Sequence, residues 1–404
     1  MNPADRRKSH REPKRICMVA YTHYRSDPRC RREAEAFVQR GDEVDFVCLG
    51  QAGDLRAEEI GGVRLIRHRM RRYRGDSALA YLLSYAAFFA RTSVLLLKLH
   101  LRRRFDVVYV HSLPELMVFV ALLPRLLGAK VVLDLHELSP ELYADRFNLS
   151  FNHPMVRFLL LAERICVRWV DGTVLCTHPQ AERLLSRCSP RRGVSVVMNV
   201  PDPELFPWRG EKAPPSAANG VFRIVHHGTL VQRNGVDVAI RAFGHLDGDI
   251  PGAELSIYGS GDFLQALKRE TELSGVSERV HISGEMLPVE AIAPAICDAQ
   301  VGVVPNMNGR VMELALPTKL IEYVALGIPA VASRTPAVSR YFDESMVMFF
   351  EPGNASDLAG CIVKLYREPE LGRSMTRNAM KFLEEYSWDK EKQKLFSVID
   401  GLET

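Results

Sequence analysis

Short apolar runs alternate with longer segments of mixed apolar and polar residues from Arg15 onward. Runs rich in Val, Ile and Leu predict strands that are buried on both faces, as in a parallel sheet covered by helices. In the first half the runs are Ile16–Tyr21, Val44–Leu49, Val63–Arg67, Val107–His111, Val131–Leu135, Thr173–Thr177 and Val194–Met198. In the second half they are Phe222–His227, Glu254–Tyr258, Val280–Ser283, Val301–Pro305, Ala330–Ser333 and Met346–Phe350.

The runs form two series, because the stretch between Asn199 and Phe222 is rich in proline and has no periodic pattern. Two such series predict an α/β chain of two Rossmann-like, doubly wound parallel-sheet domains facing each other across a cleft. The closing helices are predicted at Ser356–Arg367, Pro369–Tyr386 and Trp388–Leu402. We expect the last of them to cross back to the first domain, with Trp388 as its anchor. The expected divisions are a disordered basic leader (1–14), a first domain (15–203), a linker (204–221), a second domain (222–386) and the returning helix (387–404).

Length, composition and charge limit the classes of protein to which the chain can belong. A chain of 404 residues that is 47% hydrophobic and 25% charged is typical of a soluble globular protein with two domains. The net charge of +4 is too small to indicate nucleic-acid binding. The eight cysteines contain no Cys-x-x-Cys pair and lie mostly in apolar runs. They are therefore interpreted as reduced core residues of a cytosolic protein, and no metal site is expected.

The stretch Pro317-Thr-Lys-Leu-Ile-Glu322-Tyr-Val-Ala-Leu-Gly327-Ile-Pro329 predicts a helix with Pro317 in its first turn and Gly327 at its end. The start of a helix offers unpaired N–H groups and the positive end of a dipole to a phosphate. Glu322 lies one turn further along, where its carboxylate could accept hydrogen bonds from two hydroxyls of a sugar. Phosphate beside ribose indicates a nucleotide site. The alternative is an ordinary helix–strand connection with a solvated glutamate.

Glycine-containing turns follow three strands of the second series. His226-His-Gly228-Thr229-Leu-Val-Gln-Arg233-Asn-Gly235-Val-Asp237 joins a strand to a helix at the position where doubly wound folds bind phosphates. Arg233 could bind the same diphosphate through its guanidinium. Gly259 and Gly261 would let a planar base approach the backbone closely, and the backbone at Gly284 could reach the edge of that base. Each turn alone is equally compatible with a plain βα connection and a surface arginine.

Polar residues also follow one strand of the first series. Asp134, His136 and Glu137 end the run Val131–Leu135 and would point into the cleft. A histidine there could hydrogen-bond a substrate hydroxyl, or act as an acid or base near neutral pH. The alternative is a structural histidine, but the two neighbouring carboxylates favour a functional one.

A helix start follows the first strand, in Ser26-Asp27-Pro-Arg29-Cys-Arg-Arg32-Glu33. Asp27 is expected to cap this helix. Arg29 and Arg32 are expected to face the side of the cleft where an acceptor substrate would lie.

The stretch Leu79–Arg104 is apolar on one helical face, since Leu82, Phe89 and Leu96 are seven residues apart. The flanking arginines are Arg67, Arg69, Arg71, Arg72, Arg74, Arg102, Arg103 and Arg104. Arg91 interrupts the apolar run, which falls short of the ~20 residues that a spanning helix needs. Two interpretations remain: core helices with an exposed basic rim, or a surface that lies on anionic lipid.

As a set, these motifs resemble those of the family 4 retaining glycosyltransferases (glycosyl transferases group 1), which have the two-Rossmann-domain GT-B fold. The resemblance is strongest from Phe222 onward, through His-His-Gly-Thr-Leu, Arg-Asn-Gly-Val-Asp, Tyr-Gly-Ser-Gly and Pro-Thr-Lys-Leu-Ile-Glu-Tyr. The first half is similar more loosely, through Asp27…Arg32-Glu33, Asp134-Leu-His136-Glu137 and Asn199-Val-Pro-Asp202. The resemblance implies that the first domain binds the acceptor and the second binds a nucleotide-diphosphate sugar.

The resemblance also implies roles for single residues. Glu322 would bind the donor ribose, the backbone of Thr318 and Lys319 would hold the distal phosphate, and Arg233 would neutralise the leaving diphosphate. His136 would lie near the transferred sugar. Further implied donor contacts are Gly228, Thr229, Gly259, Gly261 and Gly284, and the implied acceptor side comprises Asp27, Arg29, Arg32, Asp134 and Glu137. Members of the family retain the anomeric configuration and commonly need no metal, so no cofactor is implied beyond the donor substrate.

Two positions depart from the family pattern. The usual pattern has two glutamates eight positions apart, but the residue eight before Glu322 is Leu314, and Glu313 is one residue off. Whether Glu313 replaces the first glutamate is left open. The usual Gly-Arg…Lys-Gly reads Gly228-Thr229…Asn234-Gly235 here, and we expect Arg233 to supply the missing charge.

The expected function is therefore transfer of a sugar, with retention, to a lipid-linked, polysaccharide or other glycan acceptor. No sequence pattern of paired carboxylates indicates a covalent double displacement, so front-face attack is preferred. The alternatives are a nucleotide-sugar epimerase of the same architecture and a catalytically silent nucleotide-sugar-binding scaffold, which the missing glutamate would suit. The expected location is the cytoplasm, and no nucleic-acid partner is expected. Of the two interpretations of the stretch Leu79–Arg104, the lipid-binding one would place the protein peripherally on the inner face of a membrane, contacted through the arginine-rich region 67–104.

Overall fold

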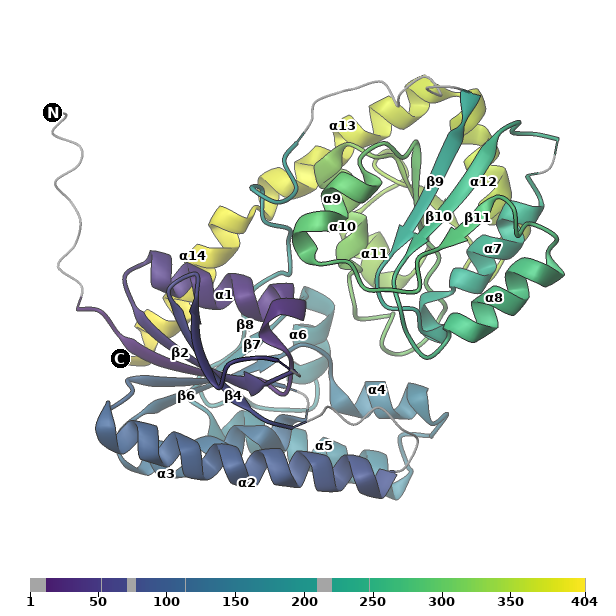
Figure 1. Ribbon diagram of the computed structural model, residues 1–404. Coiled ribbons are helices and arrows are strands. Elements are labelled where there is room, and N and C mark those ends of the chain that lie inside the picture. The colour runs from purple at the N-terminus through teal and green to yellow at the C-terminus, as the bar shows by residue number, and fades with distance from the viewer. Residues whose placement is uncertain are drawn as a thin grey trace, which may run out of the picture.

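Two α/β units lie side by side in the computed structural model of the chain (Figure 1). The structure describes residues 12–51, 53–70, 78–112, 114–208, 220–246 and 248–403. Most of the expected leader, most of the expected linker, and Arg71, Arg72 and Arg74 lie outside these residues.

The first sheet has eight strands in the order β3-β4-β2-β1-β5-β6-β7-β8. They are β1 (Arg15–Val19), β2 (Glu43–Leu49), β3 (Ala57–Ile60), β4 (Val63–His68), β5 (Val107–His111), β6 (Lys130–Leu135), β7 (Gly172–Leu175) and β8 (Ser195–Val196). All neighbours pair in parallel except β3 and β4. The sequence does not predict β3, because Ala-Glu-Glu-Ile is half polar and its side chains lie at the exposed edge of the sheet.

The second sheet has six strands, all parallel, in the order β11-β10-β9-β12-β13-β14. They are β9 (Phe222–His227), β10 (Ala253–Tyr258), β11 (Val280–Ile282), β12 (Val301–Val304), β13 (Ala330–Ser333) and β14 (Met348–Phe350). Each predicted apolar run of this half forms a strand. Both sheets reverse their strand order beside the first strand of the unit, as doubly wound sheets do.

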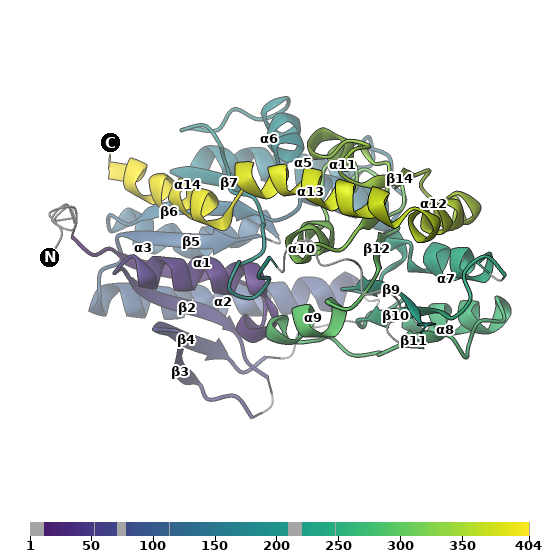
Figure 2. The same ribbon diagram turned by 90° about the horizontal axis from the view of Figure 1, so that it is seen from above.

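Helices cover both faces of each sheet (Figures 1 and 2). Those of the first unit are α1 (Pro28–Gln39), α2 (Ala78–Arg102), α3 (Leu122–Leu126), α4 (Ser139–Arg146), α5 (Pro154–Trp169) and α6 (His178–Leu185). Those of the second are α7 (Val236–Gly244), α8 (Leu264–Leu273), α9 (Val289–Ile296), α10 (Thr318–Leu326), α11 (Pro336–Tyr341), α12 (Ala355–Arg367) and α13 (Pro369–Glu385), followed by α14 (Trp388–Asp400). Short 3₁₀ turns include η2 (Tyr24–Ser26), η3 (Glu115–Ala121), η5 (Gln232–Asn234) and η6 (Gly401–Glu403).

Strand β1 shows why the first sheet is apolar on both faces. Ile16 and Met18 belong to the apolar cluster that includes side chains of α1 and α14, whereas Cys17 and Val19 belong to the cluster with α2, η3 and α5. Successive side chains of a strand point to opposite faces, so each face has its own layer of helices. The continuous apolar run in the sequence is the consequence.

Helix α14 crosses back to the first unit, as predicted (Figure 2). Trp388 is nearly buried at its start, and the guanidinium of Arg32 lies 4.5 Å from the centre of a Trp388 ring. Further along, the carboxylate of Glu391 accepts a hydrogen bond from the backbone N–H of Met198 at 2.7 Å. At the far end, Nζ of Lys14 donates to the carbonyl of Ile399 at 3.0 Å. The expectation that Trp388 anchors this helix is confirmed.

Cysteine placement agrees with the prediction of reduced core residues. All eight cysteines are free thiols. The buried ones are Cys17, Cys30, Cys48, Cys166 and Cys188. Within the described part of the chain, no helix has the length and apolar character needed to cross a bilayer.

Candidate active site

Helix α10 begins and ends close to where the sequence predicts. Pro317 precedes its first turn, with φ −64° and ψ 122°, so it lies one position before the helix proper. Gly327 ends the helix in the left-handed conformation, with φ 72°, as predicted. The first N–H groups of a helix have no partner within it, so Thr318 and Lys319 present theirs together with the positive end of the helix dipole.

The ammonium group of Lys319 lies beside the turn that follows β9. Lys319 is buried, and a side chain at Gly228 would come within 3.4 Å of its Cε and 3.7 Å of its Nζ. Its ammonium makes no hydrogen bond or ion pair with any residue that the structure describes. Burial lowers the pKa of Lys319 to about 8; Glu322 opposes this shift and Arg233 adds to it.

A buried ammonium that has no hydrogen bond or ion-pair contact, at a helix N-terminus, is a place where an anion would bind. The sequence-based expectations concern only the backbone of Lys319, not this ammonium. The signal that could have found it is a lysine in the first turn of the helix that carries Glu322.

The carboxylate of Glu322 points toward β9. Its Oε2 lies 3.1 Å from Nε2 of His227, yet neither atom has a hydrogen bond of acceptable geometry and both are buried. Burial raises the pKa of Glu322 to about 7, against the charges of Lys319 and Arg32. Burial also lowers the pKa of His227 to about 3, so this imidazole is neutral near pH 7. Glu322 therefore keeps hydrogen-bonding capacity for a ligand, and the sequence gives no sign of its neighbour His227.

The glycines of the next turn lie against the turn that follows β9. A side chain at Gly259 would overlap the carbonyl oxygen of Gly228, and one at Gly261 would overlap the backbone of Leu230. The space that a side chain would take at these glycines is filled by the neighbouring turn. Gly259 and Gly261 therefore allow two turns to pack directly, which fixes Gly228 opposite Lys319; their expected contact with a planar base stays a prediction.

The remaining residues expected at the donor lie around these turns. Gly284, two residues after β11, has the left-handed conformation, with φ 72°, and Ser283 beside it accepts a hydrogen bond from the N–H of Gly259 at 3.0 Å. Thr229 is exposed, and its carbonyl accepts from the side chain of Asn234 at 2.7 Å. This bond ties the start of the loop to η5, which carries Arg233.

Arg233 reaches the first unit. Its Nη2 donates to Oε1 of Glu137 at 3.1 Å, and 43% of the Arg233 side chain and 24% of the Glu137 side chain are exposed. The loop is fixed by Gly235, whose φ of 62° begins α7 and whose missing side chain makes room for the carbonyl of Pro305. The sequence places both charged residues at the cleft but does not predict that they pair.

Two residues expected on the acceptor side are instead buried in the first unit. Nη2 of Arg29 donates to Oδ1 of Asp134 at 2.6 Å, and Nε of Arg29 lies 3.1 Å from Oε1 of Glu33. Burial acts to raise the pKa of Asp134, but the Arg29 charge holds it well below its usual value. The expectation that Arg29 and Asp134 face an acceptor is therefore wrong, because the pairing removes both from solvent. Asp27 caps α1 as predicted, accepting from the N–H of Cys30 at 3.2 Å.

His136 is held by the same carboxylate. Its Nε2 lies 3.4 Å from Oδ2 of Asp134 and 3.1 Å from Nδ1 of His111, which is itself 3.0 Å from that oxygen. The His136 side chain remains partly exposed, whereas His111 is buried. His136 is thus held from within the protein and partly open to solvent; its role toward a substrate stays a prediction.

This cluster also contains groups of the kind that bind metals. Ligand atoms of Glu33, His111 and Asp134 lie within 4.8 Å of one another, as do those of Cys30, His111 and His136. Arg29 already pairs with both carboxylates of the first group. The donor set therefore serves a buried guanidinium.

Arg32 connects α1 with the helix that returns from the second unit. Its Nη2 donates to Oδ1 of Asn199 at 2.6 Å, and its guanidinium lies against Trp388. Burial lowers the pKa of Arg32 to about 10, while Glu322 acts to raise it. Arg32 therefore brings a first-unit cation within electrostatic range of Glu322.

The departure at position 314 has a structural explanation. Leu314 belongs to an apolar cluster of the first unit, and its carbonyl accepts a hydrogen bond from Oγ1 of Thr177 at 2.7 Å. Oε2 of the neighbouring Glu313 lies 3.6 Å from Nη2 of Arg183. Position 314 thus contributes an apolar contact between the units, and Glu313 pairs with the first unit.

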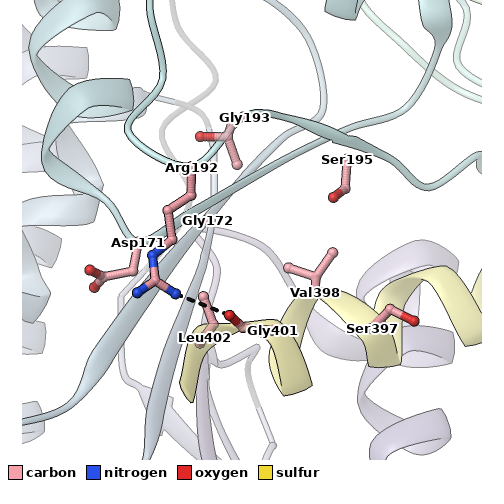
Figure 3. Close-up of a pocket in the computed structure, with 10 residues that line it drawn as sticks. Asp171, Gly172, Arg192, Gly193, Ser195, Ser397, Val398, Gly401 and Leu402 are labelled. Carbon is pink, nitrogen blue, oxygen red and sulfur yellow. Dashed lines mark hydrogen bonds between the residues drawn. The ribbon is translucent and has the colours of Figure 1, made fainter. Parts of the chain in front are cut away.

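Two cavities of the protein lie away from these residues. One, of about 330 Å³, lies between the start of β7, the segment 192–195 and α14; there Arg192 donates to the carbonyl of Gly401 at 3.0 Å (Figure 3). Another, of about 600 Å³, lies between α12 and the end of α7. Neither is lined by Lys319, Glu322 or His136. The candidate site is therefore defined by its charges and turns, not by cavity size.

Comparison with known proteins agrees with this architecture. Residues 26–200 match the family model of the glycosyl transferase 4-like domain, and residues 221–368 match that of glycosyl transferases group 1. The chain is 21% identical over 291 residues to the chitobiosyldiphosphodolichol beta-mannosyltransferase of Candida glabrata, covering 65% of this chain and 63% of that protein. It is 32% identical over 108 residues to a GDP-mannose-dependent alpha-(1-6)-phosphatidylinositol monomannoside mannosyltransferase of Mycolicibacterium smegmatis, covering 26% and 28%. Both matches span less than two thirds of the relative's own length.

Solved structures share the fold over nearly the whole chain. A sucrose-phosphate synthase from Thermosynechococcus elongatus aligns with a TM-score of 0.77 at 16% identity, covering 96% of this chain and 99% of that one. An Anabaena protein solved in complex with UDP and glucose aligns with a TM-score of 0.68 at 12% identity, covering 96% and 100%. The chain belongs to the family 4 glycosyltransferases and has the GT-B fold that its sequence motifs predict.

Proposed function

We propose that the chain is a retaining glycosyltransferase that takes its sugar from a nucleotide-diphosphate donor and needs no metal ion. The observation that carries this proposal is the buried ammonium of Lys319, unpaired within the described structure, between Gly228 and the N-terminus of α10. A diphosphate bound there would pair with this ammonium and accept from the first N–H groups of the helix. Glu322, one turn along, would accept hydrogen bonds from the ribose hydroxyls.

The proposed reaction breaks the bond between the anomeric carbon and the diphosphate oxygen. An acceptor hydroxyl forms the new bond on the same face of the sugar, and its proton passes to the departing phosphate. Negative charge that develops on the leaving group would be stabilised by Lys319, Arg233 and the α10 dipole. His136, held by Asp134 and His111, would contact the transferred sugar.

Front-face attack is preferred to a covalent intermediate. A double displacement needs a carboxylate nucleophile near the anomeric carbon. Leu314 lies where the family has its first glutamate, and Glu313 pairs with Arg183. Glu137 pairs with Arg233 and belongs, in this proposal, to the acceptor side.

The acceptor is proposed to be lipid-linked. The names of both curated relatives describe transfer of mannose to a lipid-borne acceptor, one a diphosphodolichol and the other a phosphatidylinositol. The protein would then work peripherally at the inner face of a membrane, where cytoplasmic sugar nucleotides are available. Mannose is the first donor sugar to test.

The test is mass-spectrometric turnover of a panel of sugar nucleotides, with GDP-mannose and UDP-glucose included, in the presence of EDTA. We expect slow release of nucleoside diphosphate from one donor, lost in Glu322→Gln and kept in the control Glu278→Gln, which alters an exposed carboxylate. The released sugar should keep its anomeric configuration. A product with an inverted stereocentre and an intact diphosphate would identify an epimerase instead, and binding without turnover, even with lipid acceptors present, would identify a scaffold.

A further inference from the structure

Helix α5 has an outer face made only of apolar and basic side chains. The exposed positions after its first residue are Arg157, Phe158, Leu161, Arg164, Ile165 and Arg168. They recur at intervals of three and four residues, so they form one stripe on the helix. Phe158 is 57%, Leu161 53% and Ile165 48% exposed, and contiguous exposed apolar side chains, unlike single ones, mark interaction surfaces.

The neighbouring helices extend this face. On α2, Leu83, Val94 and Leu101 are exposed, and on α3, Leu126 is 74% exposed. Among the side chains described on α2, α3 and α5, every exposed one is apolar or positively charged. We call this set of exposed side chains on the three helices the outer face.

The arginines of α5 differ from many others in the protein. Elsewhere exposed arginines pair with carboxylates, as Arg334 does with Glu344 at 2.6 Å and Arg367 does with Asp249 at 2.5 Å. Arg157, Arg164 and Arg168 make no ion pair with any residue in the described ranges. The one carboxylate of α5, Glu163, is buried and pairs with Arg187 at 2.7 Å. The charge of the outer face is therefore not neutralised by the protein itself.

The outer face lies on one side of the molecule. Helices α2, α3 and α5 run along the side of the first sheet opposite α1 and α14 (Figures 1 and 2). Helix α4, which precedes α5, carries Asp145, whose carboxylate accepts from the N–H of Val311 in the second unit at 2.9 Å. The outer face therefore extends toward the seam between the two units, where the candidate site lies.

We propose that the outer face docks on an anionic lipid bilayer, with its apolar side chains inserted at the boundary of headgroups and acyl chains and its arginines on lipid phosphates. This rests on the proposed function, in which the acceptor is borne by a lipid. Amphipathic surfaces with aromatic and leucine side chains flanked by arginines bind such membranes. A second copy fits less well, because a two-fold contact would place the unpaired arginines of both copies against each other.

The experiment is co-sedimentation of the full chain with vesicles of phosphatidylcholine, alone or mixed with phosphatidylglycerol, at low and high salt. We expect roughly tenfold or greater preference for the anionic vesicles, reduced by salt. Arg157→Glu with Arg164→Glu should lose about tenfold in vesicle affinity. Phe158→Ser with Leu161→Ser should lose the part of the binding that resists salt.

Matched controls are available on α8, where Arg269 and Leu273 are exposed. Arg269→Glu with Leu273→Ser should leave vesicle binding unchanged. Equal binding by the α5 variants and the unchanged protein, or no binding to anionic vesicles at all, would overturn the proposal. So would a dimer in sedimentation velocity that Phe158→Ser with Leu161→Ser converts to a monomer.

Donor turnover, measured on the same samples without vesicles, separates this proposal from the proposed function. The α5 variants should turn over donor like the unchanged protein, since the outer face contains none of the donor-site residues. Absence of turnover in every sample, with vesicle binding that follows the α5 variants, would reject the proposed function and leave the docking surface in place.

Discussion

Arg233 of the second unit and Glu137 of the first form an ion pair between the units, with Nη2 3.1 Å from Oε1. In the proposed reaction Arg233 binds the donor diphosphate, so a carboxylate now occupies the place of a phosphate oxygen. Donor binding must therefore compete with Glu137 for this guanidinium. Both side chains are partly exposed, so solvent screens the pair and the competition is weak.

We predict that Glu137→Gln tightens donor binding, because Arg233 is then free for the diphosphate. The gain should be about 0.2–1 kcal/mol, the range for exposed ion pairs. Titration calorimetry of both proteins with the donor that turns over would measure it. Glu254→Gln, which alters a carboxylate 4.0 Å from Arg223, is the control. Weaker binding by Glu137→Gln would mean that Glu137 itself contacts the donor.

The second prediction concerns the pH dependence of donor affinity. Glu322, with its pKa raised to about 7, accepts hydrogen bonds best when ionised, so affinity should rise as the pH rises through that value. Lys319, with its pKa lowered to about 8, is charged below it, so affinity should fall as the pH rises further. Affinity should peak between the two values. Because Glu322 and Lys319 interact, the rising and falling limbs of this pH profile describe the titration of the pair and not of either group alone.

Single variants show which residue is responsible for each limb of the pH profile. Glu322→Gln should flatten the acid limb and Lys319→Met the alkaline limb, measured as the donor Km from about pH 5.5 to 9.5. A profile with the same shape in all three proteins would show that other groups titrate.

The third prediction is that Lys319 lowers the stability of the free protein but is needed for donor binding. Its pKa falls from 10.5 to about 8 on folding, so the unfolded chain binds the proton more tightly and the charge destabilises the free protein near pH 7. Lys319→Met should therefore raise the free energy of unfolding of the free protein, by up to ~3 kcal/mol. The gain should shrink as the pH rises from about 8 to 10.5, where the lysine becomes neutral in both states. Urea unfolding at several pH values would measure this, and donor binding should be lost. A variant less stable at neutral pH would contradict the burial argument.

Local patterns predicted the strands and the ends of α10, because both depend on residues close in sequence. The apolar runs of β1 and β5 are continuous because both faces of each strand are covered. Gly327 ends α10 because the chain there takes the left-handed conformation that glycine favours. Strand β3 was not predicted because it is a half-polar strand at the edge of the sheet. Trp388 was identifiable as an anchor because a large aromatic residue at the start of a terminal helix needs a surface to cover it.

Pairings between distant residues could not be predicted in this way. Arg29 meets Asp134 because β1, β5 and β6 are neighbours in the first sheet, and strand order is not encoded in any single motif. The proximity of Glu322 to His227 depends equally on how α10 packs against β9. For Gly259 the sequence shows the glycine but not its packing, since only the structure shows that the turn at Gly228 fills the space beside it.

The fourth prediction tests the packed turns. Gly259→Ala would place a side chain on the carbonyl of Gly228, so one turn must move and the position of Gly228 opposite Lys319 is lost. We expect a loss of about 2–4 kcal/mol in the free energy of unfolding and weaker donor binding. Gly275→Ala is the matched control, because Gly275 has φ 67° with nothing within 4 Å; its backbone strain alone should cost about 1 kcal/mol. Equal losses in both variants would show that the close packing contributes nothing.

The last prediction concerns the buried ion pair of the first unit. Arg29→Met would leave the carboxylates of Asp134 and Glu33 buried without their cation, which should cost about 3–5 kcal/mol at neutral pH.

This cost should depend on pH. In the unchanged protein Arg29 lowers the pKa of Asp134, so the stabilisation by this ion pair is present above the usual aspartate pKa and is lost in acid. In the variant, burial raises the pKa values of both carboxylates, and protonation relieves them. The difference between the two proteins should therefore shrink as the pH falls from about 7.5 to 5. Arg334→Met, which breaks the exposed pair with Glu344, is the control and should cost less than about 1 kcal/mol at either pH. If the loss in Arg29→Met did not depend on pH, it would come from packing of the arginine side chain and not from its charge.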